Sequence, residues 1–415
     1  MSLLAERFRE QVSKLKDYNM KVESDFSVGY STGFLSFDFR NGTIVHAKNE
    51  AGIPLTYYSV GITDGSMVMI IGRSGCGKTT WTIQAAANIV RPFRTSCIFH
   101  DDIEGGINDS RLEQLTGFVG EELKGRYIIR NVGITTENLY QRIKIIYDNK
   151  NDHREDFLYD TGLYDTRGNR IMKLEPTVYI LDSLALLTPE KFAQEDELSG
   201  QMSTTATAKA TAMVFRKIVP MLKSVNIIFM VINHITQKVD INPMQKKKAQ
   251  VSYLKQDEAL PGGNTPVYLA NNLIRFDDVT KLKEKDGFGI DGSIVDLGLV
   301  KSRTNKAGQA ASLVFNQDMG FDQELSLLQL LKDNGRVNGA GAYLYIGDHS
   351  DMKFSQKKFK EKLATDPEFM RVVQQEVMDV LRLIIPDTSQ EQAQQQQMCA
   401  TMSSTILNEM NNVTV

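Results

Sequence analysis

The sequence predicts an α/β fold built around a mostly parallel β-sheet with helices on both faces. Short, apolar, β-branched segments recur along the chain, at residues 67–71 (MVMII), 96–100 (SCIFH), 127–130 (YIIR), 177–182 (TVYILD) and 226–232 (NIIFMVI). Stretches with helical patterning lie between them, around residues 78–90, 135–147 and 206–222. Near-continuous apolar strands that alternate with helices are typical of a parallel sheet buried on both faces.

Composition narrows the class of protein. The 415 residues are 41% hydrophobic and 24% charged, enough for one large domain with appendages or for two domains. The formal net charge is −3, so a nucleic-acid site would need its basic residues gathered locally. The cysteines Cys76, Cys97 and Cys399 lack paired or metal-like spacing, which suits a reducing cytoplasm. The longest apolar run, at 227–232, is too short to span a membrane, and we expect a cytoplasmic protein.

Appendages are expected at both ends of this core. Residues 3–18 place apolar side chains at helical spacing, and we assign residues 1–29 to an amphipathic helix and its linker. Residues 349–386 predict a small helical domain. The Gln-rich residues 387–415 predict a low-complexity, disordered tail. The core would then span residues 30–348.

Within the core, later strands and three interruptions modify the pattern. Apolar segments with short links extend the sheet with antiparallel strands, at residues 273–276, 294–301 and 312–315. The turn residues of YDTRGNRI predict a β-hairpin insertion within 148–175. Residues 188–205 and 235–263 are long polar loops, and loops of this length in a compact domain are usually functional or disordered.

The segment IIGRSGCGKTTW, residues 70–81, carries a phosphate-binding pattern. It has the spacing G-x-x-x-x-G-K-T between a predicted strand and a predicted helix. In this pattern backbone amides surround phosphate oxygens, the lysine reaches the β- and γ-phosphates, and the threonine hydroxyl binds Mg²⁺. The predicted nucleotide-binding loop consists of Gly72, Arg73, Ser74, Gly75, Cys76, Gly77, Lys78, Thr79 and Thr80.

Acidic residues at two other strand ends complete the predicted site. Asp182 ends the strand TVYILD, where its carboxylate would bind Mg²⁺ through water, together with Thr79. The turn FHDDIEGG offers Asp101, Asp102 and Glu104 for orienting or activating a water molecule, and we favour Glu104. The alternative is a solvated acidic turn without a catalytic role.

The motifs GRSGCGKTT, DIEGG, DSLALLTP, VINHI, PGGN and VKSR occur in this order along the chain. In this order and spacing the chain resembles the RecA recombinase family, and most closely the strand-exchange recombinases of T4-like phages. The resemblance covers about residues 30–348, with a looser likeness through 385. It implies a RecA-like P-loop NTPase core that binds ATP and Mg²⁺ and hydrolyses ATP in the presence of DNA.

The activity implied by the resemblance is homologous DNA recombination. Such proteins form helical filaments on single-stranded DNA and exchange this strand with homologous double-stranded DNA. Single-strand-binding and loader proteins are further candidate partners. A phage origin would place the protein in the cytoplasm of the host cell.

The residues Asn233 and His234 follow the apolar strand at 226–232. In the family the polar residue that ends this strand contacts the γ-phosphate, and the loop after it contacts single-stranded DNA. The resemblance therefore implies that His234 links the nucleotide state to the loop at 235–263. The alternative is a buried histidine that makes only structural contacts.

The two long polar loops correspond to the two DNA-binding loops of the family. Met202 in the first corresponds to an apolar residue that inserts between bases. In the second, Lys238 corresponds to a phosphate contact and Val239 to an apolar wedge. Contacts of this kind make DNA binding salt-sensitive and largely independent of sequence.

Two further features of the second loop concern DNA. Gly262 and Gly263 close the loop, and glycine permits turns or a close approach of the backbone to phosphate. The run Lys246, Lys247 and Lys248 lies beyond the part of the loop that the resemblance covers. It either contacts phosphates or forms a solvated charged surface.

The resemblance also implies an active site shared between protomers. Lys301 and Arg303 end the strand in VKSRTNK on the same face. Equivalent cations in RecA-type filaments reach the γ-phosphate on the neighbouring subunit, where an arginine can stabilise developing charge. Tyr268 corresponds to an aromatic residue that communicates across the same interface.

Several departures from the family leave other functions open. The segments at 41–58 and 148–175 are additions, Arg111 lies near the position where an aromatic residue stacks on adenine, and the tail is not strongly acidic. The alternatives are a ring-forming RecA-fold helicase, an accessory ATP-regulated filament protein and a nucleotide kinase. Residues 1–60 are too short for the N-terminal domain of such a helicase. The kinase would need a lid and an acceptor site that the sequence does not indicate.

Overall fold

The computed structural model describes residues 27–165, 168–193, 204–237, 254–255, 257–284, 287–341 and 343–385. The predicted amphipathic helix at 3–18 and the predicted tail at 387–415 lie outside these residues. No helix in the described ranges is both long enough and apolar enough to cross a membrane.

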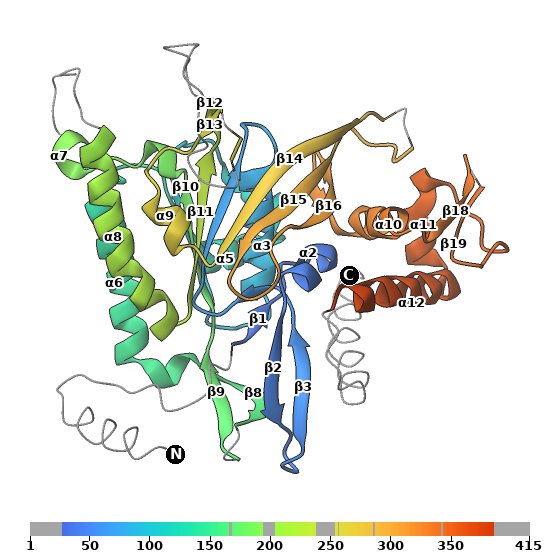
Figure 1. Ribbon diagram of the computed structural model, residues 1–415, viewed down its shortest axis with the longest axis horizontal. Helices are drawn as coiled ribbons and strands as arrows, with labels where there is room; N and C mark the ends of the chain where they lie inside the picture. Colours follow the sequence, from blue (N-terminus) through green and yellow to red (C-terminus); the bar gives the residue numbers. More distant parts are fainter. Residues whose placement is uncertain are drawn as a thin grey trace.

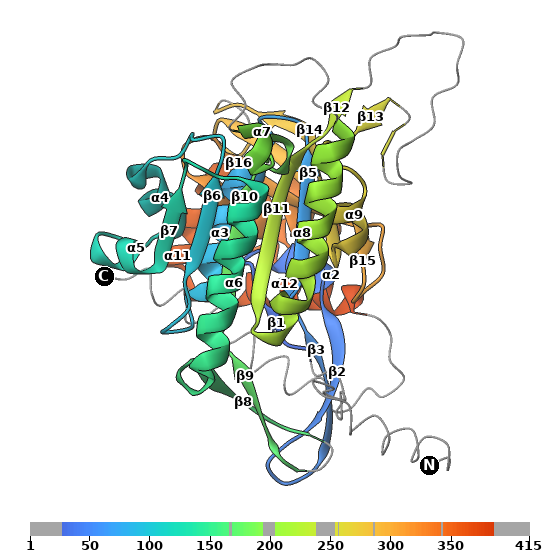
Figure 2. The ribbon, with the colours of Figure 1, turned by 90° about the vertical axis from the view of Figure 1, so that its left-hand side faces the viewer.

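A nine-stranded mixed sheet forms the centre of the molecule, in the order β17-β16-β15-β14-β5-β11-β10-β6-β7 (Figures 1 and 2). The strands from β14 to β7 are parallel, and β15, β16 and β17 continue the sheet antiparallel beyond β14. The parallel strands are β5 (Met67–Gly72), β6 (Ile98–Asp102), β7 (Tyr127–Arg130), β10 (Thr177–Asp182), β11 (Ile227–His234) and β14 (Asn272–Leu282). The antiparallel strands are β15 (Gly292–Ser302), β16 (Gln309–Asn316) and β17 (Gly320–Asp322). The predicted α/β class, with antiparallel strands added late in the chain, is confirmed.

Both faces of this sheet are buried under helices, which explains why its strands are apolar at successive positions. In β5, Val68 and Ile70 pack into one hydrophobic cluster, whereas Met67, Met69 and Ile71 pack into another. Side chains of a strand alternate between the two faces, so each face has its own core. The first face is covered by α3 (Lys78–Val90), α4 (Asp109–Thr116) and α5 (Glu121–Arg126). The second is covered by α6 (Thr136–Asp152), α8 (Thr204–Ser224) and α9 (Thr265–Leu269).

A third hydrophobic cluster joins the C-terminal helices to the antiparallel side of the sheet. It includes Phe39, Val314, Leu328, Phe359 and Phe369. These side chains come from β16 and from four helices, α2 (Leu35–Arg40), α10 (Gln323–Asp333), α11 (Phe359–Thr365) and α12 (Pro367–Ile384). The small hairpin of β18 (Val337–Ala340) and β19 (Tyr343–Ile346) and the 3₁₀ turn η3 (Gln356–Lys358) lie in the same lobe (Figure 1). Helices α11 and α12 therefore share their core with α2, α10 and β16.

A separate four-stranded sheet projects from the edge of the core opposite to β12 and β13 (Figures 1 and 2). Its order is β3-β2-β8-β9, and it consists of β2 (Thr43–Lys48), β3 (Pro54–Ser59), β8 (Leu158–Tyr164) and β9 (Arg170–Leu174). The predicted hairpin is present as β8 and β9, although residues 148–152 before it belong to α6. The 3₁₀ turn η1 (Arg154–Phe157) connects the two. The additions at 41–58 and 148–175 thus meet in one sheet, which we call the arm.

Short elements complete the described chain. Strand β1 (Gly29–Tyr30) pairs with β4 (Ile62–Thr63), and β12 (Thr236–Gln237) pairs with β13 (Glu258–Ala259). The 3₁₀ turn η2 (Leu184–Leu186) precedes the predicted loop at 188–205, and helix α7 (Glu190–Ala193) lies within that range, so residues 190–193 are helical rather than loop.

Candidate nucleotide-binding site

The loop between β5 and α3 has the geometry that the phosphate-binding pattern requires. Gly75 and Gly77 adopt positive φ angles of 77° and 85°, in the left-handed region. A Cβ atom on Gly77 would also lie 3.0 Å from the Phe321 ring, so this position has no room for a side chain. Arg73, Ser74 and Gly75 are exposed at the tip, Cys76 is buried, and Thr80 is half-buried on α3. The loop therefore presents backbone at the N-terminus of a 13-residue helix, where anions bind.

The Lys78 side chain lies against the rim of this loop. It is 4% exposed, and its ammonium donates to the carbonyl oxygens of Gly72 (3.2 Å) and Arg73 (2.7 Å). Its Nζ atom is also 3.5 Å from Nδ1 of His234. The cation is thus held at the loop, next to the backbone that would surround a phosphate.

Asp182 lies beside Thr79, as the predicted magnesium site requires. The Thr79 hydroxyl donates to Oδ2 of Asp182 at 2.5 Å, while Oδ1 is buried and has no hydrogen-bond partner among the described residues. Burial raises the pKa of Asp182 to about 6, an effect that the Thr79 hydrogen bond opposes and the nearby Glu104 and Asp102 carboxylates reinforce. A divalent cation would satisfy the free oxygen and favour the ionised form. The donor set, a hydroxyl and a carboxylate, suits Mg²⁺. No group of three or more His, Cys, Asp or Glu side chains in the described ranges has metal-binding geometry, so water and phosphate would supply most of the remaining ligands.

His234 connects the two halves of the site. Its Nε2 atom lies 2.7 Å from Oε1 of Glu104, and its Nδ1 atom faces the Lys78 ammonium. Because Lys78 can only donate, a neutral ring with its proton on Nε2 satisfies both contacts. The imidazole is therefore placed between Lys78, the lysine predicted to bind phosphate, and the carboxylate predicted to orient water.

The sheet order explains why His234 occupies this central position. Strand β11 lies between β5 and β10, and His234 is paired in register with Gly72, the last residue of β5 (Figure 2). The carboxyl ends of parallel strands meet at one edge of the sheet, so the ends of β5, β11, β10 and β6 bring together Gly72, His234, Asp182 and the turn with Glu104.

The same strand end leads directly into the predicted DNA loop. Thr236 and Gln237 pair with Ala259 and Glu258 to form a short stem, two residues after His234. The Asn233 side chain donates to the carbonyl oxygen of Pro261 at 2.9 Å. Both ends of the segment that contains residues 238–253 are therefore attached to β11.

A buried ion pair fixes the far side of this stem. Glu258, 1% exposed, accepts two hydrogen bonds from the guanidinium of Arg275, at 2.8 and 2.9 Å. Arg275 lies on β14, in register with Ile71 of β5, and also binds Asp277 at 2.8 Å. The stem is thus tied to β11 and β14, the two strands on either side of β5. No sequence pattern predicts this pair, because Glu258 and Arg275 lie on different strands, β13 and β14. Only the folded chain brings them together.

The structure separates the three acidic residues of the turn FHDDIEGG. Asp101 points to the second face, where it binds Arg142 at 2.5 Å and the Tyr179 hydroxyl at 2.6 Å. Asp102 is buried, and its Oδ1 accepts from the Gly105 amide at 2.9 Å. Glu104 is the partly exposed carboxylate that contacts His234.

Lys301 and Arg303 lie away from the P-loop of their own chain. The Lys301 ammonium donates to the carbonyl oxygens of Val267, Tyr268 and Ala270, at 2.7 to 2.9 Å, and Arg303 donates to the Tyr268 oxygen at 2.8 Å. Burial and the nearby Arg303 lower the pKa of Lys301 to about 8. Both cations therefore stabilise the C-terminal end of α9.

The strand register gives the separation of Arg303 from the predicted phosphate-binding loop. The Arg303 amide binds the Asn271 carbonyl, and the Asn271 amide binds the carbonyl of Met67, the first residue of β5. Gly72 lies five residues further along that strand, or roughly 17 Å at the usual rise. The Tyr268 side chain is 56% exposed on α9.

Two of the other predicted DNA contacts, Gly262 and Gly263, lie within the described residues. Gly262 and Gly263 have positive φ angles of 84° and 79°, and Cβ atoms there would meet Leu184 (3.0 Å) and Ala208 (3.2 Å). These glycines therefore allow the chain to pack closely on η2 and α8. The remaining predicted contacts, Met202, Lys238, Val239, Lys246, Lys247 and Lys248, lie outside the described residues.

Arg111 lies on α4, close to the loop before β17. Its guanidinium binds the carbonyl oxygens of Gln317 and Asp318 and the Gln114 side chain at 2.5 Å. It therefore links α4 to the antiparallel part of the sheet.

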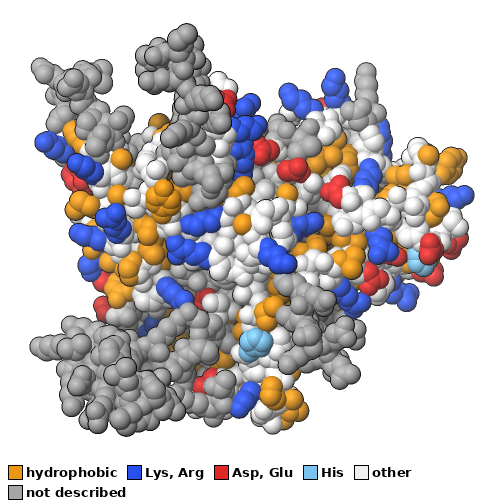
Figure 3. Space-filling model, in the orientation of Figure 1, with side chains coloured by type: hydrophobic (Ala, Val, Ile, Leu, Met, Phe, Trp, Pro, Cys, Tyr) orange, Lys and Arg blue, Asp and Glu red, His pale blue; other side chains and the backbone are white. Residues whose placement is uncertain are grey.

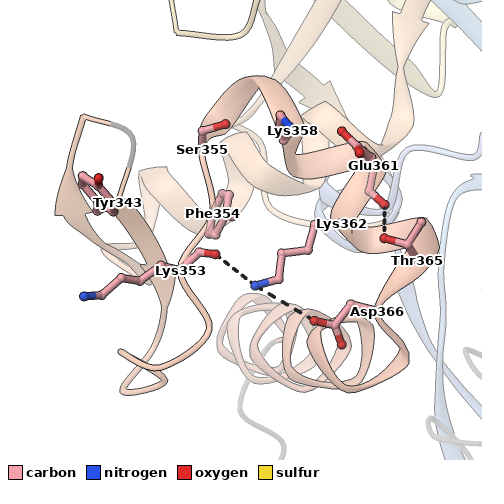
Figure 4. Close-up of a pocket in the computed structure, with 9 residues that line it drawn as sticks. All are labelled: Tyr343, Lys353, Phe354, Ser355, Lys358, Glu361, Lys362, Thr365 and Asp366. Atoms are coloured by element: carbon pink, nitrogen blue, oxygen red, sulfur yellow. Dashed lines mark hydrogen bonds and ion pairs between the residues drawn. The ribbon is translucent and has the colours of Figure 1, made fainter.

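The C-terminal lobe also carries a groove. It has a volume of about 470 Å³ and lies between β19, η3 and α11, with Tyr343, Phe354 and three lysines among its lining residues (Figure 4). Lys362 is engaged by the Lys353 carbonyl and by Asp366, and Glu361 also lines the groove. Figure 3 shows basic and acidic side chains interspersed over one face of the molecule. The lining of the groove itself combines basic and acidic side chains.

Neither a scan against protein-family models nor a search of curated proteins finds a match to this chain. The site is therefore defined by its own geometry.

Proposed function

We propose that this chain is an ATP-dependent DNA recombinase with a RecA-like P-loop core, which assembles into helical filaments on single-stranded DNA and exchanges strands with homologous duplex DNA. The observation that carries the proposal is the position of His234. It contacts Glu104 and faces Lys78, and it is two residues from the stem of the segment that contains Lys246, Lys247 and Lys248.

Each part of the candidate site fits phosphoryl transfer to water. The loop amides and Lys78 would hold the β- and γ-phosphates of ATP, and Thr79 and Asp182 would hold Mg²⁺. A bound Mg²⁺ supplies charge stabilisation on the phosphate oxygens. Glu104 would orient the attacking water and accept its proton, and the His234 N–H holds that carboxylate in place. This chemistry depends mainly on positioning and electrostatics.

Coupling to DNA follows from the contacts of His234 and Asn233. A γ-phosphate close to Lys78 would compete for that ammonium and shift the imidazole or its Glu104 partner. Any movement of the β11 end is passed to the stem through Thr236 and to its far side through the Asn233–Pro261 bond. The nucleotide would thereby bias the loop between DNA-binding and released states.

A shared site between protomers is supported by the position of Lys301 and Arg303. Roughly five residues of strand length separate Arg303 from Gly72 of its own chain, and roughly three separate Lys301 from it, so a phosphate on a neighbouring subunit is their proposed target. They also hold the end of α9, where Tyr268 is exposed. Filament assembly and nucleotide binding would then be linked.

The alternatives make different predictions from the same core. A non-catalytic accessory protein has no need for Lys78, Asp182 and Glu104 together, and all three are present in a connected arrangement. A ring helicase shares this arrangement and differs in assembly. Electron microscopy with single-stranded DNA and an ATP analogue separates the two, because extended helices support the recombinase and closed hexamers support the helicase.

The decisive activity test is ATP hydrolysis with and without single-stranded DNA. We expect DNA to raise the rate by at least tenfold, and strand exchange between homologous substrates to require ATP. An equal rate with and without DNA would contradict coupling through His234. ATPase activity without strand exchange would favour the helicase.

A further inference from the structure

A second buried carboxylate faces the same space as Asp182. Asp102, the last residue of β6, is paired directly with Asp182, the last residue of β10. Both side chains point to the α3 face, because Ile98 and Ile180, at even-numbered positions of these strands, belong to the first hydrophobic cluster. Neighbouring strands lie about 4.8 Å apart, so the two carboxylates are close neighbours.

Each of these carboxylates has one buried oxygen that has no hydrogen-bond partner in the part of the chain that the structure describes. Asp102 and Asp182 are each 2% exposed, and the unpartnered atoms are Oδ2 of Asp102 and Oδ1 of Asp182. Two adjacent buried carboxylates with free oxygens are unfavourable unless a cation or a proton joins them. The Thr79 hydroxyl lies next to these carboxylates, because it donates a hydrogen bond to Oδ2 of Asp182.

The other oxygen of Asp102, Oδ1, makes a hydrogen bond to the backbone. Oδ1 accepts a hydrogen bond from the Gly105 amide at 2.9 Å, which fixes the turn that carries Glu104. One carboxylate therefore contacts both the space next to Asp182 and the backbone that positions the predicted water-orienting residue.

We propose that Asp102 is a further carboxylate of the divalent-cation site, acting with Asp182 and Thr79, and that it aligns the Glu104 turn with the bound metal. The inference rests on the proposed nucleotide site and extends it by one residue. Sequence reasoning grouped Asp102 with its neighbours in an acidic turn, and only the β6–β10 register distinguishes it from Asp101.

Asp102→Asn separates the two tasks of this residue. An asparagine oxygen can still accept from the Gly105 amide, so the turn is retained, whereas the negative charge is lost. A purely structural role would leave metal binding unchanged in this variant. Asp101→Asn is the matched control, since it removes a neighbouring buried carboxylate that faces Arg142 on the opposite side of the sheet.

The test measures Mn²⁺ binding to the full chain in the presence of ADP, by the loss of the free Mn²⁺ electron paramagnetic resonance signal. We expect Asp102→Asn to weaken Mn²⁺ binding 10- to 100-fold, the range for losing a supporting metal ligand. Metal-free ADP binding should be unchanged, and Asp101→Asn should stay within about threefold of the unsubstituted chain. The fluorescence of Trp81, the single tryptophan of the chain, two residues after Thr79, reports whether each variant is folded. If Asp102→Asn does not fold, Asp102→Ser is measured instead.

The outcomes are distinct. Mn²⁺ affinity unchanged or higher in Asp102→Asn, with loss in Asp182→Asn, would overturn the inference and indicate a proton shared between the carboxylates. If the unsubstituted chain binds neither ADP nor Mn²⁺ with ADP, the proposed ATPase function fails and the inference fails with it.

Discussion

The ion pair between Glu258 and Arg275 should be the strongest single anchor of the predicted DNA loop. Glu258 is 1% exposed and Arg275 is 9% exposed, and two hydrogen bonds join them. Removing one partner of such a pair leaves an uncompensated buried charge and costs about 3–5 kcal/mol. In Arg275→Met the Lys255 amide is the one donor that Glu258 keeps among the described residues, and we expect a loss of about 3 kcal/mol or more. In Glu258→Gln the guanidinium keeps Asp277, and we expect about 2 kcal/mol.

The loss should be local, because the pair ties the β13 side of the stem to β14. A cost of about 3 kcal/mol corresponds to amide exchange faster by roughly 100-fold in peptides spanning residues 257–264, measured by hydrogen–deuterium exchange with mass spectrometry. Arg382→Met is the matched control, since Arg382 and its partner Asp379 are 40% and 38% exposed and such pairs contribute at most about 1 kcal/mol. If amide exchange in this peptide is equally fast in Arg275→Met and Arg382→Met, the Glu258–Arg275 pair is not the anchor.

The pair should also give the loop a characteristic response to acid. The hydrogen bond from Arg275 lowers the pKa of Glu258 below its ordinary value of 4.5. Its stabilising effect is therefore complete above that ordinary value and is lost as the pH falls through the lowered one. Exchange near the stem should accelerate in acid in the unsubstituted chain and lack this response in Glu258→Gln. A similar acid response in both proteins would assign it to another group.

Three further predictions concern the proposed function. Changing His234 to Ala should reduce the stimulation of ATPase activity by single-stranded DNA at least tenfold while nucleotide affinity changes little, and unchanged stimulation would refute its role in coupling. An Arg303→Ala chain should hydrolyse ATP poorly alone and recover when mixed with a Lys78→Ala chain, as shared sites require; a mixed filament that stays inactive would exclude the trans role. Metal-dependent ADP binding should weaken about tenfold between pH 7 and pH 5, because the pKa of Asp182 is raised to about 6 and protonation removes the ligand; an equal pH dependence in Asp182→Asn would point to another group.

The linear order of apolar segments predicted most strands of the central sheet, but not β17. Strands β7 and β10 have the predicted bounds, and α3 begins and ends where its pattern does. Burial on both faces makes such strands apolar at every position, so their signal is strong. Strand β6 begins two residues later than predicted, at Ile98, because Ser96 and Cys97 lie before the pairing with β10 and β7.

The sequence predicted the candidate site only where its residues are contiguous along the chain. The P-loop residues Gly72–Thr80 are contiguous, so their pattern was readable. The contact of His234 with Glu104, and the opposite orientations of Asp101 and Asp102, depend on strand order and register. Those are tertiary properties, since a shift of one residue reverses the face that every side chain occupies.

The position of the arm adds a constraint on how the molecule can assemble. Its two hairpins come from segments about a hundred residues apart, yet they pair at Lys48 and Tyr164 and share an apolar cluster around Val45 and Ala47. The arm is attached at its base by the Lys173–Asp64 ion pair at 2.8 Å and lies at the edge of the core opposite to the β12–β13 stem (Figure 1). In a filament whose DNA loops face the axis, this opposite edge would face away from the DNA. If the proposed function holds, the arm would leave nucleotide chemistry and DNA binding intact while extending the outer part of the assembly.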